Sequence, residues 1–198
     1  MHPLLWVILQ LVLCAAPATA GELPGTCHVS FDATSTLHDF AGTAACAPFV
    51  LAVTAPADGE ARLEAVTLAV PVAGMRTGID RRDRTMRDMF DAGRFPQIVG
   101  RLPAAPLAEL RRQLHRAAAD GTTFPLELRI RDREQTVTAR ITALTDAADG
   151  FRVDLQFPVS LAASGLKPPT VMGFIRVGDE VRVKVSVQLA PLPTPWQP

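Results

Sequence analysis

The stretch that decides the fold is Val72–Gly100, VAGMRTGIDRRDRTMRDMFDAGRFPQIVG. Apolar side chains stand in its charged middle at Met86, Met89 and Phe90, and this i, i+3, i+4 spacing places them on one face of a short helix. The charged residues between them are expected to form a solvated face. Phe95-Pro96 then requires extended backbone, so a strand should follow. With strand-like sequence on both sides, we expect this helix to plug one end of a β-barrel.

Outside this stretch, apolar and polar residues alternate through most of the chain, which is typical of strands with one buried face. Successive strands with hairpin-length turns predict an antiparallel sheet, and long strands in this number tend to close. The predicted fold class is all-β, with one barrel over residues 21–190 and its short helix near Arg82–Phe90. Arg62–Val72 is expected to form one long strand. We expect these side chains to point inward: Phe31, Leu68, Phe90, Leu126, Leu128, Phe157 and Val183.

A second helix is expected near Pro106–Ala119. Leu107, Leu110 and Leu114 recur at helical spacing, and Asp120-Gly121 provides an end. The helix is amphipathic, which allows two interpretations. It packs on the side or end of the barrel, or it docks on a membrane surface or a partner.

Residues 1–20 are expected to be a secretory signal peptide. Leu4–Ala16 is almost entirely apolar, and Ala18-Thr19-Ala20 is a small-x-small cleavage site before Gly21. The apolar run is short for a membrane span, although an uncleaved anchor is the alternative. We therefore expect a periplasmic or secreted protein that has no stable membrane span after signal cleavage. The Pro-rich residues 191–198 are expected to form a loosely packed or disordered tail.

Signal cleavage would leave two cysteines, Cys27 and Cys46. An even pair in an exported protein favours a disulfide. The midpoint between them falls at Thr36-Leu37, so a hairpin turning there would bring them opposite each other. The alternative is two buried free thiols. A structural zinc site is disfavoured, because it needs four ligands.

No sequence motif predicts a cofactor or an enzyme. The chain has no P-loop, no GxGxxG after a strand, no HExxH and no CxxC, and its 20 basic residues balance 20 acidic ones, which disfavours nucleic acid as a partner. Ser35, His38 and Asp39 are residue types of a hydrolytic triad, but so close in a tight hairpin they rarely converge. The preferred interpretation is turn chemistry, in which Ser35, Thr36 and Asp39 bond their own backbone. The His38 ring is then a polar group of the rim, or a contact for a ligand headgroup.

Three segments resemble one family. The first is the motif formed by Thr77, Gly78, Arg82, Asp83, Met86, Met89, Phe90 and Pro96. The second is the hairpin Ser35–Phe40, STLHDF, with Gly42, and the third runs from Ser164–Pro169 through Val177–Val181. Together they are similar to the YceI-like family. That resemblance implies a lipocalin-like antiparallel β-barrel in the bacterial periplasm, whose interior in some members binds a polyisoprenoid chain such as a quinone tail. The Pro106–Ala119 helix departs from the family pattern.

The resemblance also implies a ligand. We expect an apolar chain, of an isoprenoid, a quinone or another lipid, to lie inside the barrel and to enter beside the plug helix. No charged group is required inside, so binding should depend little on salt. The alternative is a structural or interaction module with a filled barrel, and a homodimer is left open. The expected ligand-binding residues are Leu37, His38, Phe40, Met75, Met86, Met89, Phe90, Phe95, Leu128, Phe157, Val159, Met172 and Phe174.

Overall fold

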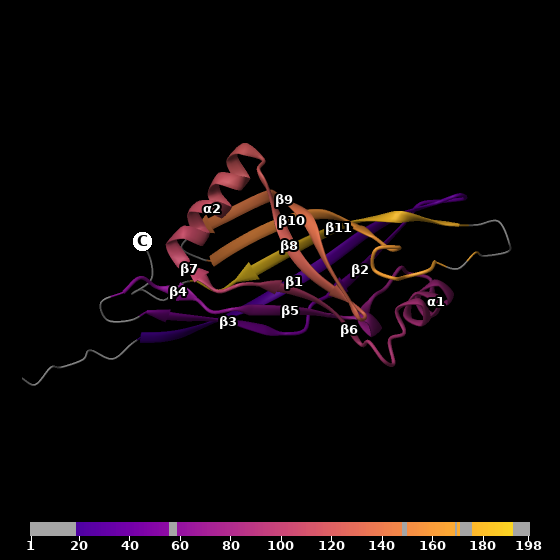
Figure 1. Ribbon diagram of the computed structural model, residues 1–198, viewed down its shortest axis with the longest axis horizontal. Helices are drawn as coiled ribbons and strands as arrows, with labels where there is room; N and C mark the ends of the chain where they lie inside the picture. Colours follow the sequence, from indigo (N-terminus) through magenta and orange to yellow (C-terminus); the bar gives the residue numbers. More distant parts are fainter. Residues whose placement is uncertain (1–18, 56–58, 148–149, 169, 171–175, 192–198) are drawn as a thin grey trace, which may run out of the picture.

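Strands of one antiparallel sheet curl strongly into a half-barrel, with a helix at each end (Figure 1). The computed structural model describes residues 19–55, 59–147, 150–168, 170 and 176–191. Its elements are β1 (Thr19–Ser35), β2 (Phe40–Ala45), β3 (Phe49–Ala55), β4 (Arg62–Leu63), β5 (Val66–Pro71), a 3₁₀ turn (Val72–Gly74), α1 (Asp80–Phe90), β6 (Gln97–Leu102), β7 (Ala105–Pro106), α2 (Leu107–Asp120), β8 (Thr123–Ile130), β9 (Arg133–Ala147), β10 (Gly150–Ser160) and β11 (Val177–Leu189). The all-β, lipocalin-like fold class and the two predicted helices are confirmed.

The sheet is organised around its first strand. Its order is β5-β6-β8-β9-β10-β11-β1-β3-β4-β7, with β2 also paired to β1. β1 pairs with the last strand, β11, from Gly25 opposite Leu189 to Ser35 opposite Val177. Buried and exposed residues alternate along β1, so one face of this strand lies in the core.

The other side of β1 is covered by β2 and β3 in succession. His28 pairs with Ala45 on β2, whereas Gly25 pairs with Phe49 on β3, so the partner chain contains one extra residue between them. Pro48 lies in this insertion, and it has no N–H to contribute to a ladder. The two short strands therefore act as one long partner for β1 that is interrupted by a bulge.

The bulge helps to draw the two sides of the half-barrel together. The Ala47 N–H donates to the Ala69 carbonyl of β5 over 2.7 Å. Thr43 of β2 and Arg76, beyond the 3₁₀ turn, exchange two backbone hydrogen bonds of 2.8 Å. Because β5 stands at the far end of the sheet order, these few bonds link strands that are distant in the ladder.

The prediction of one long strand over Arg62–Val72 is wrong in one respect, because the chain changes its strand partner within this segment. Residues 62–63 pair with β3 as β4, and residues 66–71 pair with β6 as β5. At the break the Glu64 N–H donates to the Ala52 carbonyl, and the Glu64 carboxylate accepts a hydrogen bond from the Thr54 hydroxyl, both at 2.9 Å. β7 was not expected either, and it forms a short outer strand on β4.

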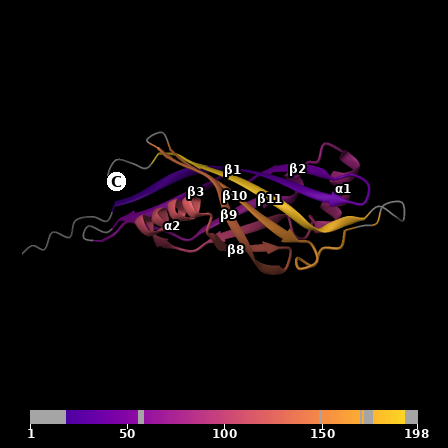
Figure 2. The same ribbon diagram turned by 90° about the horizontal axis from the view of Figure 1, so that it is seen from above.

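Helix α2 packs on the half-barrel at the end opposite to α1, as both views show (Figures 1 and 2). Its bounds agree with the expected ones to within one residue. Leu107 and Leu110 pack against a core cluster formed by Leu23, Leu51, Val53, Leu63 and Val66. Its apolar stripe is therefore used inside the molecule, as the packed interpretation predicted.

An ionic group fixes α2 to β9. The Asp146 carboxylate is 3.0 Å from Nε of Arg111 and 2.9 Å from Nε2 of His115. Burial opposes ionisation of Asp146, but the hydrogen bonds from His115 and Arg111 outweigh it and hold the pKa below its usual value. No helix in the part of the chain that the structure describes is long and apolar enough to span a bilayer.

Candidate functional site

The interior of the half-barrel contains a cavity of about 480 Å³. This volume is within the usual range of about 300–1,000 Å³ for small-molecule sites. Strands β1, β2, β5, β6, β8, β10 and β11 and helix α1 contribute to its wall, which is almost wholly apolar. All seven side chains expected to point inward line it: Phe31, Leu68, Phe90, Leu126, Leu128, Phe157 and Val183.

Most of the expected ligand-binding residues also lie in this wall. They are Leu37, His38, Phe40, Met75, Met86, Met89, Phe90, Leu128, Phe157 and Val159. Phe95 is not in the wall, because its ring packs against the guanidinium groups of Arg94 and Arg131, at 4.9 and 5.4 Å. Met172 and Phe174 fall outside the described residues. The part that any of these residues plays in binding stays a prediction.

The start of α1 is fixed by a carboxylate that the sequence placed on the solvated face. Gly78, at φ +78°, provides the turn before the helix. Asp83 then reaches back, and its Oδ1 accepts the Thr77 N–H at 2.8 Å and the Thr77 hydroxyl at 2.6 Å. Only 3% of Asp83 is exposed, so the expectation of a fully solvated charged face is wrong at this residue.

The environment of Asp83 favours its ionised form. The largest cause of its lowered pKa is the hydrogen bond that the Thr77 hydroxyl donates, and burial opposes this lowering. The Thr77 N–H and the charges of Arg76 and Arg87 add to the lowering, so the pKa lies below its usual value of 3.8. This carboxylate joins the turn to the helix and so orients the face that carries Met86 and Phe90, both buried.

The hairpin between β1 and β2 contributes to the cavity wall, as α1 does. Its Ser35 hydroxyl donates to the His38 carbonyl at 2.6 Å and accepts the His38 N–H at 3.1 Å. The Asp39 carboxylate accepts the Ser35 N–H at 3.2 Å. The expected turn chemistry is therefore confirmed for Ser35 and Asp39, whereas the Thr36 hydroxyl accepts the N–H of the distant Arg176 at 3.1 Å. The Ser35 hydroxyl is held by backbone rather than by the imidazole. The hairpin presents Leu37 and His38 at the cavity.

Residues of this hairpin and of the start of α1 form an exposed part of the cavity wall, which we call the mouth. Leu37 and Ile79 line it while keeping 55% and 49% of their surface exposed. Arg81 and Arg82 also belong to the wall, and the Arg82 guanidinium stacks over the Phe40 ring at 4.4 Å. From the sequence we expected no need for charge inside the barrel, and we did not foresee these two arginines at the mouth.

Sequence reasoning missed these mouth residues, although one signal was available. Arg82 precedes Met86 by four positions, which puts both on one face of the helix. Thr85 and Met89 share the same relation, and both line the cavity. This spacing was not used for Arg82, because we expected the charged residues of this helix to face solvent.

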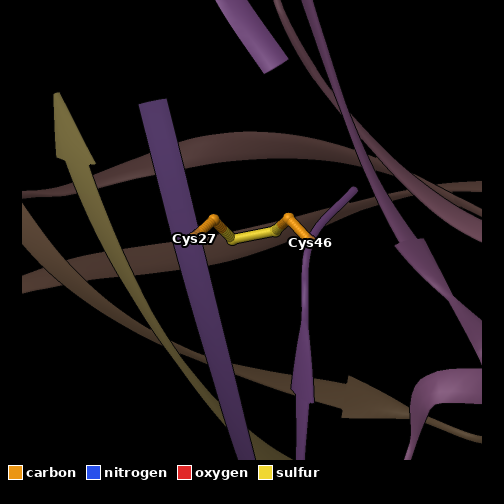
Figure 3. Close-up of a disulfide and its surroundings, with 2 residues drawn as sticks. All are labelled: Cys27 and Cys46. Carbon is orange, nitrogen blue, oxygen red and sulfur yellow. A yellow bond between two sulfur atoms is a disulfide. The ribbon is translucent and has the colours of Figure 1, made fainter. Parts of the chain in front are cut away.

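The predicted disulfide between Cys27 and Cys46 is confirmed (Figure 3). Both cysteines line the cavity. It joins β1 to the residue that follows β2, with the two Cα atoms 5.1 Å apart. The Cys46 N–H donates to the Cys27 carbonyl at 3.0 Å, so the cysteines are opposite each other, as a hairpin centred on Thr36-Leu37 requires. Within the described ranges, no group of three or more His, Cys, Asp or Glu side chains could hold a metal ion.

Comparisons with known proteins agree on the family and on the fold. The model of the YceI-like domain matches residues 24–189. Among solved structures, BcnA of Burkholderia cenocepacia has a TM-score of 0.55 and 18% identity over 82% of this chain and 95% of its own. A polyisoprenoid binding domain from Saccharophagus degradans, implicated in plant cell wall breakdown, also has a TM-score of 0.55, with 14% identity over 85% and 98%. At these identities the likeness shows the fold alone. No curated protein sequence matches the chain.

Proposed function

Because this chain belongs to the YceI-like family, we propose that it binds an apolar chain inside its half-barrel and acts as an exported carrier or sequestering protein. The chain would come from an isoprenoid, a quinone or another lipid. The observation that carries the proposal is the cavity of about 480 Å³ with its apolar wall. The similarity to a polyisoprenoid binding domain supports the same ligand class.

The two ends of the half-barrel differ in a way that favours binding over a purely structural role. At the α2 end, Leu107 and Leu110 fill the space above Leu51 and Leu63 with side chains. Towards α1, the side chains of the wall surround the cavity instead of filling it. Burying an apolar chain there would gain about 0.8 kcal/mol per CH₂ group, less the cost of ordering the chain. A filled structural module would have no use for this space.

Export is the second part of the proposal. A disulfide is stable in an oxidising compartment, and the bond between Cys27 and Cys46 agrees with a periplasmic or secreted protein. Cleavage of the signal before Gly21 would remove only the first two residues of β1. The proposed mature chain would therefore keep the strand and its disulfide.

Lipid extraction of the purified mature protein tests the proposal directly. We expect an apolar molecule to co-purify, and added quinone to raise the melting temperature of protein stripped of lipid. Met89→Asp and Phe157→Asp, which place charge in the wall, should each abolish both effects. Val50→Asp is the matched control, because Val50 is 50% exposed and outside the wall. If nothing apolar co-purifies and quinone leaves the melting temperature unchanged, the proposal fails in favour of a structural module.

A further inference from the structure

The charged residues of the cavity wall are all of one sign. Among the described residues of the wall they are Arg81, Arg82 and Arg101, and none of these described residues is Asp or Glu. Arg81 and Arg82 occupy the first turn of α1 at the mouth, where the hairpin also brings His38. An apolar chain alone gives no reason for arginines beside it.

The arginines of the wall differ in what balances their charge. Arg101 on β6 is paired with Glu134 at 3.0 Å. Across the described residues, neither Arg81 nor Arg82 forms a salt bridge. The neighbouring acid, Asp83, accepts its two short hydrogen bonds from Thr77 instead.

Arg82 is also held in position. Its guanidinium lies 4.4 Å from the centre of the Phe40 ring, and both residues are half-buried parts of the wall. Stacking on a ring uses the face of the guanidinium and leaves its N–H donors, in the plane, free to bind an oxyanion. The mouth therefore presents two arginines without a salt bridge among the described residues, one of them held in position, next to an apolar interior.

We infer that the ligand is an amphiphile whose apolar chain ends in an anionic group, a carboxylate or a phosphate, that Arg81 and Arg82 bind at the mouth. This inference rests on the proposed function, because the chain must occupy the cavity for its head to reach these side chains. Charge-assisted hydrogen bonds from arginine to carboxylate or phosphate are strong and can be bidentate. Binding then depends on salt, contrary to the expectation for a wholly apolar site.

Three probes with the same saturated chain separate the head from the tail: hexadecanoate, hexadecyl phosphate and hexadecan-1-ol. Titration calorimetry on the stripped mature protein, below the micelle concentrations, gives the dissociation constants. We expect at least one anionic probe to bind about tenfold or more tightly than the alcohol. This preference should shrink as salt rises from about 50 to about 500 mM, whereas alcohol binding should hardly change.

Substitutions locate the effect. Arg81→Gln with Arg82→Gln should remove the preference, so that the variant binds the anionic probes no more tightly than it binds the alcohol. A cooperative thermal unfolding transition shows that the variant is folded. Arg84→Gln is the matched control, because it removes the same charge from an exposed position of α1 outside the wall. It should keep the preference.

Each outcome separates the two proposals. A preference for hexadecyl phosphate alone supports the inference with phosphate as the head, and a preference for hexadecanoate supports it with carboxylate. If all three probes bind equally, or if the double variant keeps the preference, the inference is overturned and the apolar carrier stands. If none binds, the proposed function fails and the inference fails with it.

Discussion

Replacing Thr77 by valine should destabilise the protein by about 2 kcal/mol, because the hydroxyl donates to a charged and buried acceptor. The bond from Oγ1 of Thr77 to Oδ1 of Asp83 measures 2.6 Å, and only 3% of Asp83 is exposed. A hydrogen bond to a charged group contributes about 1.5–3 kcal/mol net, and the Thr77 N–H stays bound in the variant. For a chain of this size, the loss corresponds to a fall in melting temperature of roughly 4–8 °C.

A double-mutant cycle measured by urea unfolding tests this value. Thr77→Val, Asp83→Ala and the double variant should give a coupling energy of at least about 1 kcal/mol. Asp88→Ala removes an exposed acid from the same helix and should change stability by no more than about 0.5 kcal/mol. Single costs that add to within about 0.5 kcal/mol would refute the reasoning, because the pair would then act independently.

The same pair sets a pH dependence with a defined sign. Because the folded state lowers the pKa of Asp83 below its usual 3.8, the ionised carboxylate stabilises the fold above that value. This stability is lost as pH falls through the lowered pKa. The stability difference between the wild type and Asp83→Ala should therefore be constant near neutral pH and shrink below about pH 4. An undiminished difference down to about pH 2 would contradict it.

Three further predictions concern the rest of the molecule. Replacing Cys27 and Cys46 by serine should lower the free energy of unfolding by about 3 kcal/mol, since the bond closes a loop over a sequence separation of 19. Urea unfolding with and without reductant measures this loss. A wild type whose unfolding is insensitive to reductant would contradict the prediction. Gly42→Ala should cost about 1–3 kcal/mol because its new methyl group meets a phenyl ring, whereas Gly93→Ala, with open space around it, should be nearly neutral in the same assay. Asp146→Ala should cost about 1–3 kcal/mol and speed hydrogen exchange in α2 before the strands; unchanged protection of α2 would show that the ionic group does not hold it.

The parts that the sequence predicts well depend on short separations. Met86, Met89 and Phe90 define α1 because a helix repeats every few residues. Cys27 and Cys46 pair because one hairpin places them at equal distances from its turn. In both cases the spacing alone implies the geometry.

The parts that the sequence does not predict depend on contacts between elements. The break at Glu64 follows from a change of strand partner, which no local pattern records. Asp83 is buried because Thr77, on the preceding turn, needs an acceptor. Arg82 belongs to the cavity because the hairpin brings Phe40 beneath it. Because Asp83 and Arg82 are charged, the sequence predicted that both would be exposed. Contacts with other elements bury Asp83 and place Arg82 in the cavity wall instead.

The pairing of β1 with β11 has a consequence for the order in which the protein is made. Gly25 and Leu189 are far apart in the sequence, so β1 lacks one of its neighbours until the whole stretch between them has been made. At about 5–20 residues per second, that wait lasts roughly ten to thirty seconds. The hairpin of β1 and β2 can form early, and the bond between Cys27 and Cys46 can lock it in place. Of the described strands of the cavity wall, β11 is made last, so the ligand proposed above could be enclosed only after β11 has been added.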